Sequence, residues 1–233
     1  MVTTASPPMG SIATQSFASQ AITTRLVPKH EISAAQQERM VDVLTDSFLS
    51  YPEHVLMWGS DRKINRTLME GTVANGIAKH RVWLAQTKDD IVGVGLWTDP
   101  GAVWISEVDI PAVFGSVMEL IEPEFLQFML GDMLPGQAGI EEKYIPGCAT
   151  DSYFGAILGV DPKAQNCGIG GKIMVDIIKN AGDVPIMLHT QGPKNLHFYG
   201  KYGFKVAAEH EFVLPSGEKW LDNLLVRRPD GSV

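Results

Sequence analysis

The segment that most limits how this chain can fold is residues 157–172, which read ILGVDPKAQNCGIGGK. A strand-like apolar run is followed by a proline-marked break and then by a glycine-rich turn that opens a helix-like pattern. The first N–H groups of a helix have no acceptor within the helix and lie at the positive end of its dipole, so they can bind a phosphate. Gly168, Gly170 and Gly171 remove the side chains that would block such a ligand. The segment therefore predicts a phosphate-bearing ligand at a strand-to-helix junction.

Three kinds of phosphate-binding turn have patterns close to this segment. A P-loop, GxxxxGK[ST], requires glycine where Asn166 stands and serine or threonine where Ile173 stands. A dinucleotide-binding turn, G-x-G-x-x-G or A, also meets Ile173 at its sixth position, and it follows the first strand of a βαβ unit, whereas this turn lies late in the chain. The third pattern, Gln or Arg-x-x-Gly-x-Gly or Ala, is met by Gln165, Gly168 and Gly170.

A second feature, residues 189–204, reads HTQGPKNLHFYGKYGF. Together with the Gln165 pattern it resembles the GNAT (GCN5-related N-acetyltransferase) superfamily, whose strand-loop-helix element carries Asn, Phe-Tyr and Gly-Phe at these intervals. Residues 46–52 and 95–100 extend the resemblance toward the puromycin N-acetyltransferase branch. The resemblance implies an enzyme that transfers an acetyl group from acetyl-CoA to a primary amine of a small molecule, by direct attack in a ternary complex.

The fold class that we expect is α/β (α+β), with a mixed, mostly antiparallel central sheet of six to seven strands flanked by helices. Residues 1–22 carry no charge and are rich in Ser, Thr, Ala and Pro, which predicts a flexible tail before a single domain at 23–233. Residues 104–144 predict a helical insert near the acceptor site, which Pro111, Pro123 and Pro135 cut into short helices. Strands are predicted at residues 24–28, 81–86, 91–96, 153–160, 185–190, 205–214 and 220–226, and helices after Ser33 and Asp61 and at residues 168–180 and 195–202.

The resemblance also assigns roles to residues. Tyr199 takes the position of the general acid that protonates the departing thiolate, which a phenol of pKa about 10 can do at modest cost because the pKa of a thiol, about 8.5, is not far below it. A backbone N–H near Val160 would bind the oxyanion. Residues that would bind acetyl-CoA are Leu158, Val160, Gln165, Gly168, Ile169, Gly170, Gly171, Lys172, Asn195 and Tyr202.

The acceptor side is less constrained. His189 is a candidate general base because its ordinary pKa lies near neutrality, with a hydrogen-bonded structural histidine or a water relay as the alternatives. Asn195, assigned above to acetyl-CoA binding, has the alternative role of an N-cap for the helix that follows Pro193. Tyr51 and Trp97 match residues that line the acceptor pocket in the resembling branch, although core packing explains Trp97 equally well.

Composition excludes several classes of function. Nineteen Lys and Arg against 27 Asp and Glu give a net charge of −8, which does not suit nucleic acid. Cys148 and Cys167 form no CxxC pair, so no metal and no disulfide framework is expected, and a reducing, cytoplasmic location fits. No apolar run reaches the roughly 18 residues of a membrane helix.

Several alternatives stay open. The protein could be a protein lysine or N-terminal acetyltransferase, it could acetylate an alcohol, or it could be a silent acyl-CoA-binding module. It could also be a monomer or a homodimer.

Overall fold

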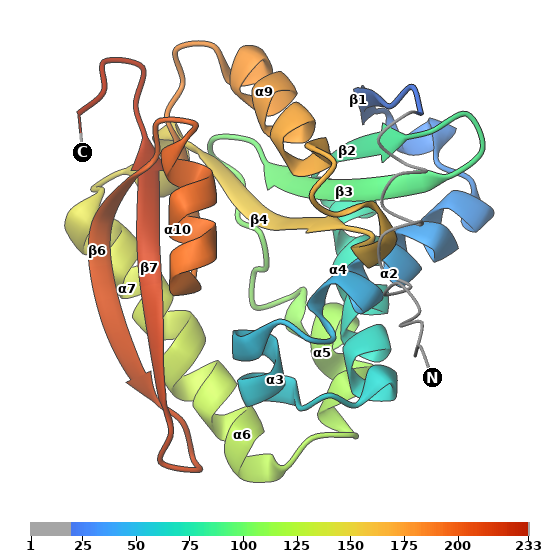
Figure 1. Cartoon of the computed structure of the whole chain (residues 1–233). Coiled ribbons are helices and arrows are strands. Elements are labelled where there is room, and N and C mark those ends of the chain that lie inside the picture. The colour runs from blue at the N-terminus through green and yellow to red at the C-terminus, as the bar shows by residue number, and fades with distance from the viewer. Residues whose placement is uncertain (1–19, 233) are drawn as a thin grey trace, which may run out of the picture.

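A seven-stranded sheet forms the centre of the computed structural model, which describes residues 20–232 (Figure 1). The strand order is β1-β2-β3-β4-β5-β7-β6, and of the neighbouring pairs β4 and β5 alone run parallel. The predicted mixed, mostly antiparallel sheet is confirmed. The predicted tail lies almost entirely outside the described residues. The strands are β1 (Thr23–Val27), β2 (Arg81–Gln86), β3 (Ile91–Thr98), β4 (Tyr153–Val160), β5 (Ile186–Thr190), β6 (Lys205–Val213) and β7 (Lys219–Arg227).

Local sequence explains where the main helices begin. The Ser33 side chain accepts the backbone N–H of Gln36, whose side chain accepts the backbone N–H of Ser33, so a capping box opens the helix predicted after Ser33. Asp61 accepts the N–H groups of Lys63 and Ile64. The helices outside the insert are α2 (Ala34–Phe48), α3 (Pro52–Trp58), α4 (Arg62–Lys79), α9 (Ile169–Ala181) and α10 (Gly192–Gly200), with short turns η1 (Lys29–Glu31) and η3 (Pro162–Ala164).

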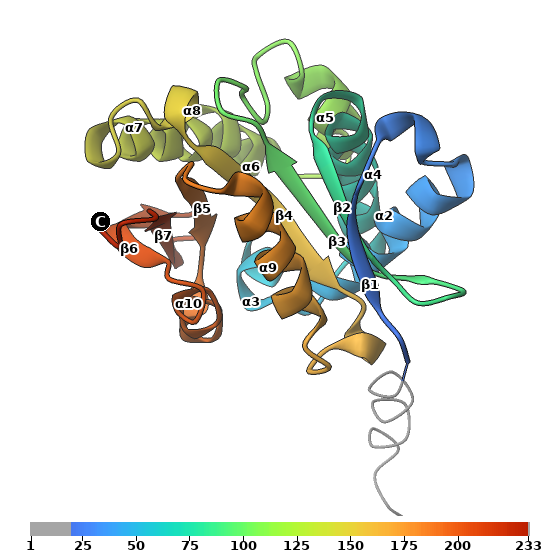
Figure 2. The ribbon, with the colours of Figure 1, turned by 90° about the horizontal axis from the view of Figure 1, so that it is seen from above.

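Helices cover both faces of the sheet (Figure 2). One face carries α2 and α4, and α9 packs on the other, against β1 to β4. All eight residues of β3 are buried as a result. A strand covered on both faces reads as a continuous apolar run, which is why residues 91–96 could be recognised from sequence. None of the helices within residues 20–232 is long and apolar enough to cross a membrane.

The insert is helical, as predicted, but Pro135 does not interrupt it. α5 (Ile110–Met118) is followed by α6 (Pro123–Phe128), by the π-helical turn η2 (Met129–Met133) and directly by α7 (Leu134–Tyr144), and α8 (Cys148–Asp151) comes after. Proline lacks an N–H and crowds the preceding turn of an α-helix, and a wider π turn just before it lets the chain continue. Outside the insert, Pro52 stands at the first position of α3, where its missing N–H would have no acceptor within the helix.

Two irregularities of β4, a bulge and an early end to its pairing with β5, leave part of one strand edge unpaired. Leu96 pairs with Ile157 and Trp97 with Gly155, so Ala156 is an extra residue and forms a bulge. Pairing with β5 is confined to residues 153–155 against residues 186–188. Beyond Gly155 the two strands diverge, and the edge of β4 that faces β5 has no neighbouring strand.

Candidate active site

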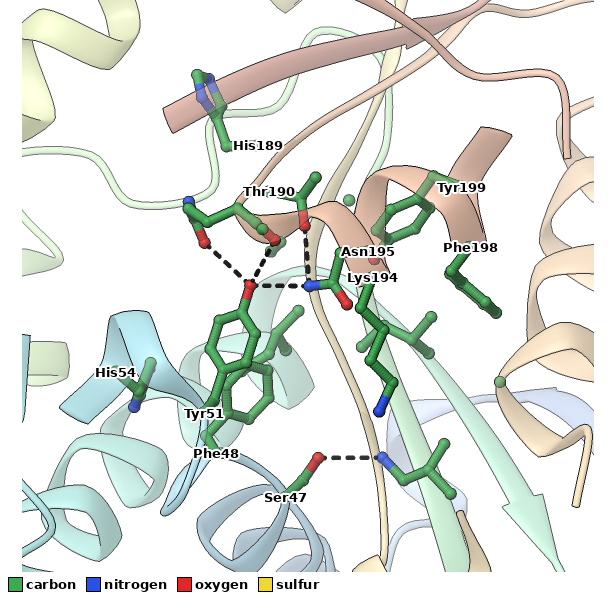
Figure 3. Close-up of a pocket in the computed structure, with 18 of the residues that line it drawn as sticks. Ser47, Phe48, Tyr51, His54, His189, Thr190, Lys194, Asn195, Phe198 and Tyr199 are labelled. Atoms are coloured by element: carbon green, nitrogen blue, oxygen red, sulfur yellow. Dashed lines mark hydrogen bonds between the residues drawn. The ribbon is translucent and has the colours of Figure 1, made fainter. Parts of the chain in front are cut away.

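A cleft of about 940 Å³ opens where β4 and β5 diverge. It continues between α3 and α10 and reaches the insert, so it is formed by segments from the whole length of the chain (Figure 3). Most of the residues predicted for the site line it. They are Tyr51, Trp97, Leu158, Val160, Gln165, Gly168, Ile169, Gly170, Gly171, His189, Asn195, Tyr199 and Tyr202.

The N-terminus of α9 forms one wall of the cleft. Gly168 precedes this helix with φ +77°, a left-handed conformation that glycine adopts without strain, and no side chain caps the helix. A Cβ on Gly170 would meet Phe198 only at 3.5 Å, whereas one on Gly171 would collide with the Tyr202 hydroxyl. The glycines therefore have different roles: Gly168 makes the turn, Gly170 leaves the N–H groups accessible, and Gly171 makes room for Tyr202.

The free edge of β4 lies beside this helix start. The Val160 N–H donates to the Ser47 hydroxyl over 3.3 Å, and its carbonyl accepts from the Gln165 side chain over 3.1 Å. The N–H that the sequence assigned to an oxyanion thus already has a partner, one that a ligand could replace. Leu158 is half-buried on the same edge. The edge can therefore exchange its side-chain hydrogen bonds for bonds to an extended ligand.

Two residues predicted to touch the cofactor are placed differently. Ile169 is 1% exposed and packs in the core below α9, so only its backbone can serve a ligand. Lys172 is exposed and does not line the cleft; it borders a smaller hollow where the Thr24 hydroxyl donates to Asp176. Side chains in the first turn of a helix point in different directions, so the motif alone could not separate these two from the glycines.

Tyr199 lies on α10 with its ring edge-on to Phe198 and Phe204, at centroid distances of 5.1 and 5.5 Å. It lines the cleft and is half-buried. Burial raises the pKa of its phenol well above the usual value, so the group stays protonated at neutral pH. The phenol therefore has a proton to donate, as the predicted role requires, although the raised pKa makes its transfer to a thiolate more costly.

Asn195 and Tyr51 were predicted for opposite halves of the site, yet they are in contact. The Asn195 amide donates to the Tyr51 hydroxyl over 2.8 Å and to the Thr190 hydroxyl over 3.1 Å. The Tyr51 hydroxyl donates to the backbone carbonyl of Gln191 over 3.0 Å. Figure 3 shows the Tyr51 hydroxyl between Asn195 and Gln191, with Asn195 also bonded to Thr190. They join α3 to the junction of β5 and α10 across the cleft.

His189 does not have the free nitrogen that a general base needs. Its Nδ1 lies 2.5 Å from Asp222 Oδ2 and its Nε2 lies 3.0 Å from Glu141 Oε1. Burial lowers the pKa of the imidazole, but bonds to the two carboxylates outweigh burial and raise the pKa to about 9. A protonated ring that donates at both nitrogens cannot accept a proton. Of the alternatives that the sequence left open, this geometry favours the hydrogen-bonded structural histidine, which links Glu141 on α7 to Asp222 on β7.

Trp97 packs as a core residue. Only 1% of it is exposed, and its indole ring fills the space above Gly155, where a Cβ would clash with it. Within the described residues its Nε1 has no hydrogen-bond partner. Of the two explanations that the sequence left open, the structure favours core packing, because a ring this enclosed cannot present its face to a ligand.

Among the described lining residues that sequence reasoning missed, three have titratable side chains. Lys194 and Lys201 are exposed on and after α10. His54, on α3, approaches Asn65 Oδ1 with Nδ1 over 2.9 Å, and the Asn65 amide donates to two backbone carbonyls, which fixes its orientation. The imidazole therefore carries its proton on Nδ1, and burial lowers its pKa to about 4. No motif surrounds these residues, so only their positions identify them.

A search of the described residues finds no group of His, Cys, Asp and Glu side chains that could hold a metal ion. A comparison with models of known protein families finds no match.

Solved structures do resemble the chain. A histone acetyltransferase and related acetyltransferase from Corynebacterium glutamicum is 18% identical, with a TM-score of 0.59 over 89% of this chain and 96% of its own. Polyamine N-acetyltransferase of Drosophila melanogaster is 14% identical, with a TM-score of 0.55 over 89% and 100%. An acetyltransferase assigned to the GNAT family from Desulfovibrio desulfuricans is 12% identical, with a TM-score of 0.51 over 89% and 99%. The fold of this chain is therefore that of the GNAT acetyltransferases.

Proposed function

We propose that the protein is an acetyl-CoA-dependent N-acetyltransferase that acetylates a primary amine of a small molecule. One observation carries the proposal: the gap between β4 and β5 meets the uncapped N-terminus of α9 in a single cleft. A ligand with a pyrophosphate at one end and an extended amide-containing arm fits both parts at once. The Corynebacterium and Drosophila proteins, whose fold this chain shares, are acetyltransferases.

The charges along the cleft support an anionic ligand. The chain carries a net charge of −8, yet Lys194 and Lys201 line the cleft and none of its described side chains is an aspartate or glutamate. The pyrophosphate would lie on the N–H groups after Gly168, where the helix dipole adds positive potential. The pantetheine arm would lie along residues 156–160 and replace the bond between Val160 and Ser47. Gln165 would hold the turn against the strand.

Acetyl-CoA supplies the acetyl group as a thioester. In the proposed reaction the amine nitrogen attacks the thioester carbon directly, the carbon–sulfur bond breaks, and the Tyr199 phenol gives its proton to the departing thiolate. The amine must lose one proton to attack and a second when the amide forms. Because His189 is already protonated, we assign these protons to water in the cleft, which keeps the water relay that the sequence left open. One of the two protons returns to the Tyr199 phenolate and the other leaves to solvent.

The enclosure of the cleft favours a small acceptor over a protein side chain. α7 and the turn η2 contribute lining residues at the far end, and the bonds of Tyr51 join the two walls. The acetylated polyamine of the Drosophila protein is a small amine as well. A cytoplasmic location and a monomeric or dimeric state remain predictions from the sequence.

Thiol release from acetyl-CoA, followed in the presence of a panel of primary amines and alcohols, tests the proposal. We expect release above the rate of the amine-free control, together with an acetylated amine identified by mass spectrometry. Acetyl-CoA binding without an acetylated product would instead identify a silent acyl-CoA-binding module. Failure of acetyl-CoA to bind at all would contradict the assignment of the cleft.

A further inference from the structure

We infer that His54 is a specificity-determining residue, whose Nε2 accepts a hydrogen bond from a hydroxyl or N–H group that the acceptor carries in addition to the amine that is acetylated. This inference rests on the proposed function and adds a second polar group to its substrate. Two independent observations carry it. The protonated nitrogen of the ring is fixed against α4, and the other nitrogen borders the cleft without a partner among the described residues.

Asn65 sets the tautomer of His54. The Asn65 side chain is fully buried on α4, and its amide donates to the backbone carbonyls of Gly59 over 3.2 Å and Asp61 over 2.9 Å. The amide oxygen therefore faces His54 Nδ1, 2.9 Å away, and an amide oxygen can only accept. Nδ1 must carry the ring proton, so Nε2 keeps a lone pair and can accept a hydrogen bond but cannot donate one.

Aromatic neighbours hold the imidazole at the wall of the cleft. The ring centroids of His54 and Phe48 are 4.9 Å apart, and those of His54 and Trp58 are 6.4 Å apart. The ring is half-buried and lines the cleft, and within the described residues Asn65 is its one hydrogen-bond partner. In this part of the chain Nε2 is not among the enclosed polar atoms that lack a partner, so it keeps access to the space that the ring borders.

The ring is uncharged at neutral pH. Burial is the main cause that lowers its pKa to about 4, and the bond to Asn65 offsets only part of that effect. A neutral imidazole does not select its ligand by charge, but by whether the ligand can donate a hydrogen bond. A site that contains such a polar atom discriminates against an analogue without the matching donor, because that analogue takes the place of water and leaves the atom unpaired.

His54 lies away from the atoms that react in the proposed mechanism. Figure 3 shows it on α3, on the far side of Tyr51 from Tyr199. The Tyr51 hydroxyl is already bonded to Asn195 and to the Gln191 carbonyl, so it does not supply the donor that Nε2 lacks. The group that bonds to His54 is therefore a different one from the attacking amine, and the acceptor has to extend past Tyr51 to reach it.

Matched pairs of amines test the inference. In a series of ω-amino alcohols of increasing chain length, each alcohol is compared with its methyl ether, which has a similar shape but cannot donate a hydrogen bond. At the length that reaches His54, we expect kcat/KM for the alcohol to exceed that for the ether by about tenfold or more, and the ratio to fall to about one in His54→Phe. No preference for the alcohol at any length, or the same preference in His54→Phe, would overturn the inference. Thiol release with other amines would then leave the proposed function intact.

Nuclear magnetic resonance of the wild-type protein, with isotope-labelled histidine, gives a readout that needs neither turnover nor a variant. At neutral pH we expect His54 to carry its proton on Nδ1. Its Nε2 resonance should move when the preferred amino alcohol is added to the CoA-bound protein, but not when the methyl ether is added. His80 is the internal control, because it does not line the cleft and its Nε2 approaches the Trp104 carbonyl at 3.0 Å. A His54 ring protonated on Nε2, or one that responds to neither compound, would overturn the inference.

Discussion

The two ends of the cleft are built on different principles. The end assigned to acetyl-CoA is mostly backbone: the uncapped start of α9 and the unpaired edge of β4, both within residues 156–171. The acceptor end is mostly side chains, contributed by α3, α4, α5, η2 and α7. Backbone N–H and C=O groups can bind a ligand that never changes, such as acetyl-CoA, with little dependence on side chains. Specificity for an acceptor depends on which side chains line its pocket. A change at either end should therefore have a different signature.

The largest effect that we expect is on cofactor binding. Gly170→Asp would put a carboxylate beside the pyrophosphate, and two unit charges about 4 Å apart repel by about 4 kcal/mol at intermediate dielectric, or about a thousandfold in Kd. Gly170→Ala is the matched control, because a Cβ there makes only ordinary contacts, with Phe198 at 3.5 Å and Val160 at 3.8 Å. Calorimetry with acetyl-CoA measures both. Tight binding of acetyl-CoA by the aspartate variant would show that the pyrophosphate does not bind at this turn.

The next effect concerns the stability of the protein, through the His189 ion pairs that link α7 to the sheet. His189→Gln would leave Asp222 and Glu141 as buried carboxylates without a cation, which costs about 3 kcal/mol. Urea unfolding should show this loss, and Asp222→Asn in the His189→Gln background should recover part of it. If His189→Gln kept the stability of the wild type but lost kcat, the general-base role of His189 would be supported instead.

The pH dependence of stability offers a separate check on His189. Its folded pKa of about 9 lies above the unfolded value. A group with a raised pKa stabilises the fold fully below its unfolded pKa of about 6.5, and that stability disappears as the pH rises through the folded pKa. The free energy of unfolding should therefore fall by about 3 kcal/mol between pH values of about 6 and 9.5. His189→Gln should lack this decline.

Tyr199 lies between the two ends of the cleft. Tyr199→Phe should slow the acetyl-transfer step without changing the binding of acetyl-CoA. Removing the phenolic proton should lower kcat by about 100-fold while the Kd for acetyl-CoA changes by less than about threefold. Rapid-quench measurement of the acetyl-transfer step, compared with wild type, isolates the proton transfer. Unaltered kcat with a good acceptor would take Tyr199 out of the mechanism.

The smallest expected effect tests whether the ends are coupled. Tyr51→Phe keeps the ring but deletes the hydroxyl that bonds to Asn195 and Gln191 across the cleft. Loss of one such bond is worth about 1 kcal/mol, so KM for the amine should rise about fivefold with kcat changed less. A drop in kcat with constant KM would mean that the hydroxyl acts on the reacting atoms instead.

The sequence by itself determined the features that are local in the chain. The turn at Gly168, the start of α9 and the position of Tyr199 on α10 all follow from short runs of residues, because turn and helix signals act over a few positions. The strands were found for the same reason, and the sheet class followed from their order. Even the capping box at Ser33 could be read directly.

Only the tertiary structure decided what His189 does and what the acceptor end is made of. The partners of His189 lie 33 and 48 residues away, and no local pattern links a histidine to Asp222 or Glu141. The contact of Tyr51 with Asn195 spans 144 residues. A pKa depends on every charge and on the burial around a group, and the polarity of a pocket depends on all of its walls. Both quantities exist only once distant segments have packed together.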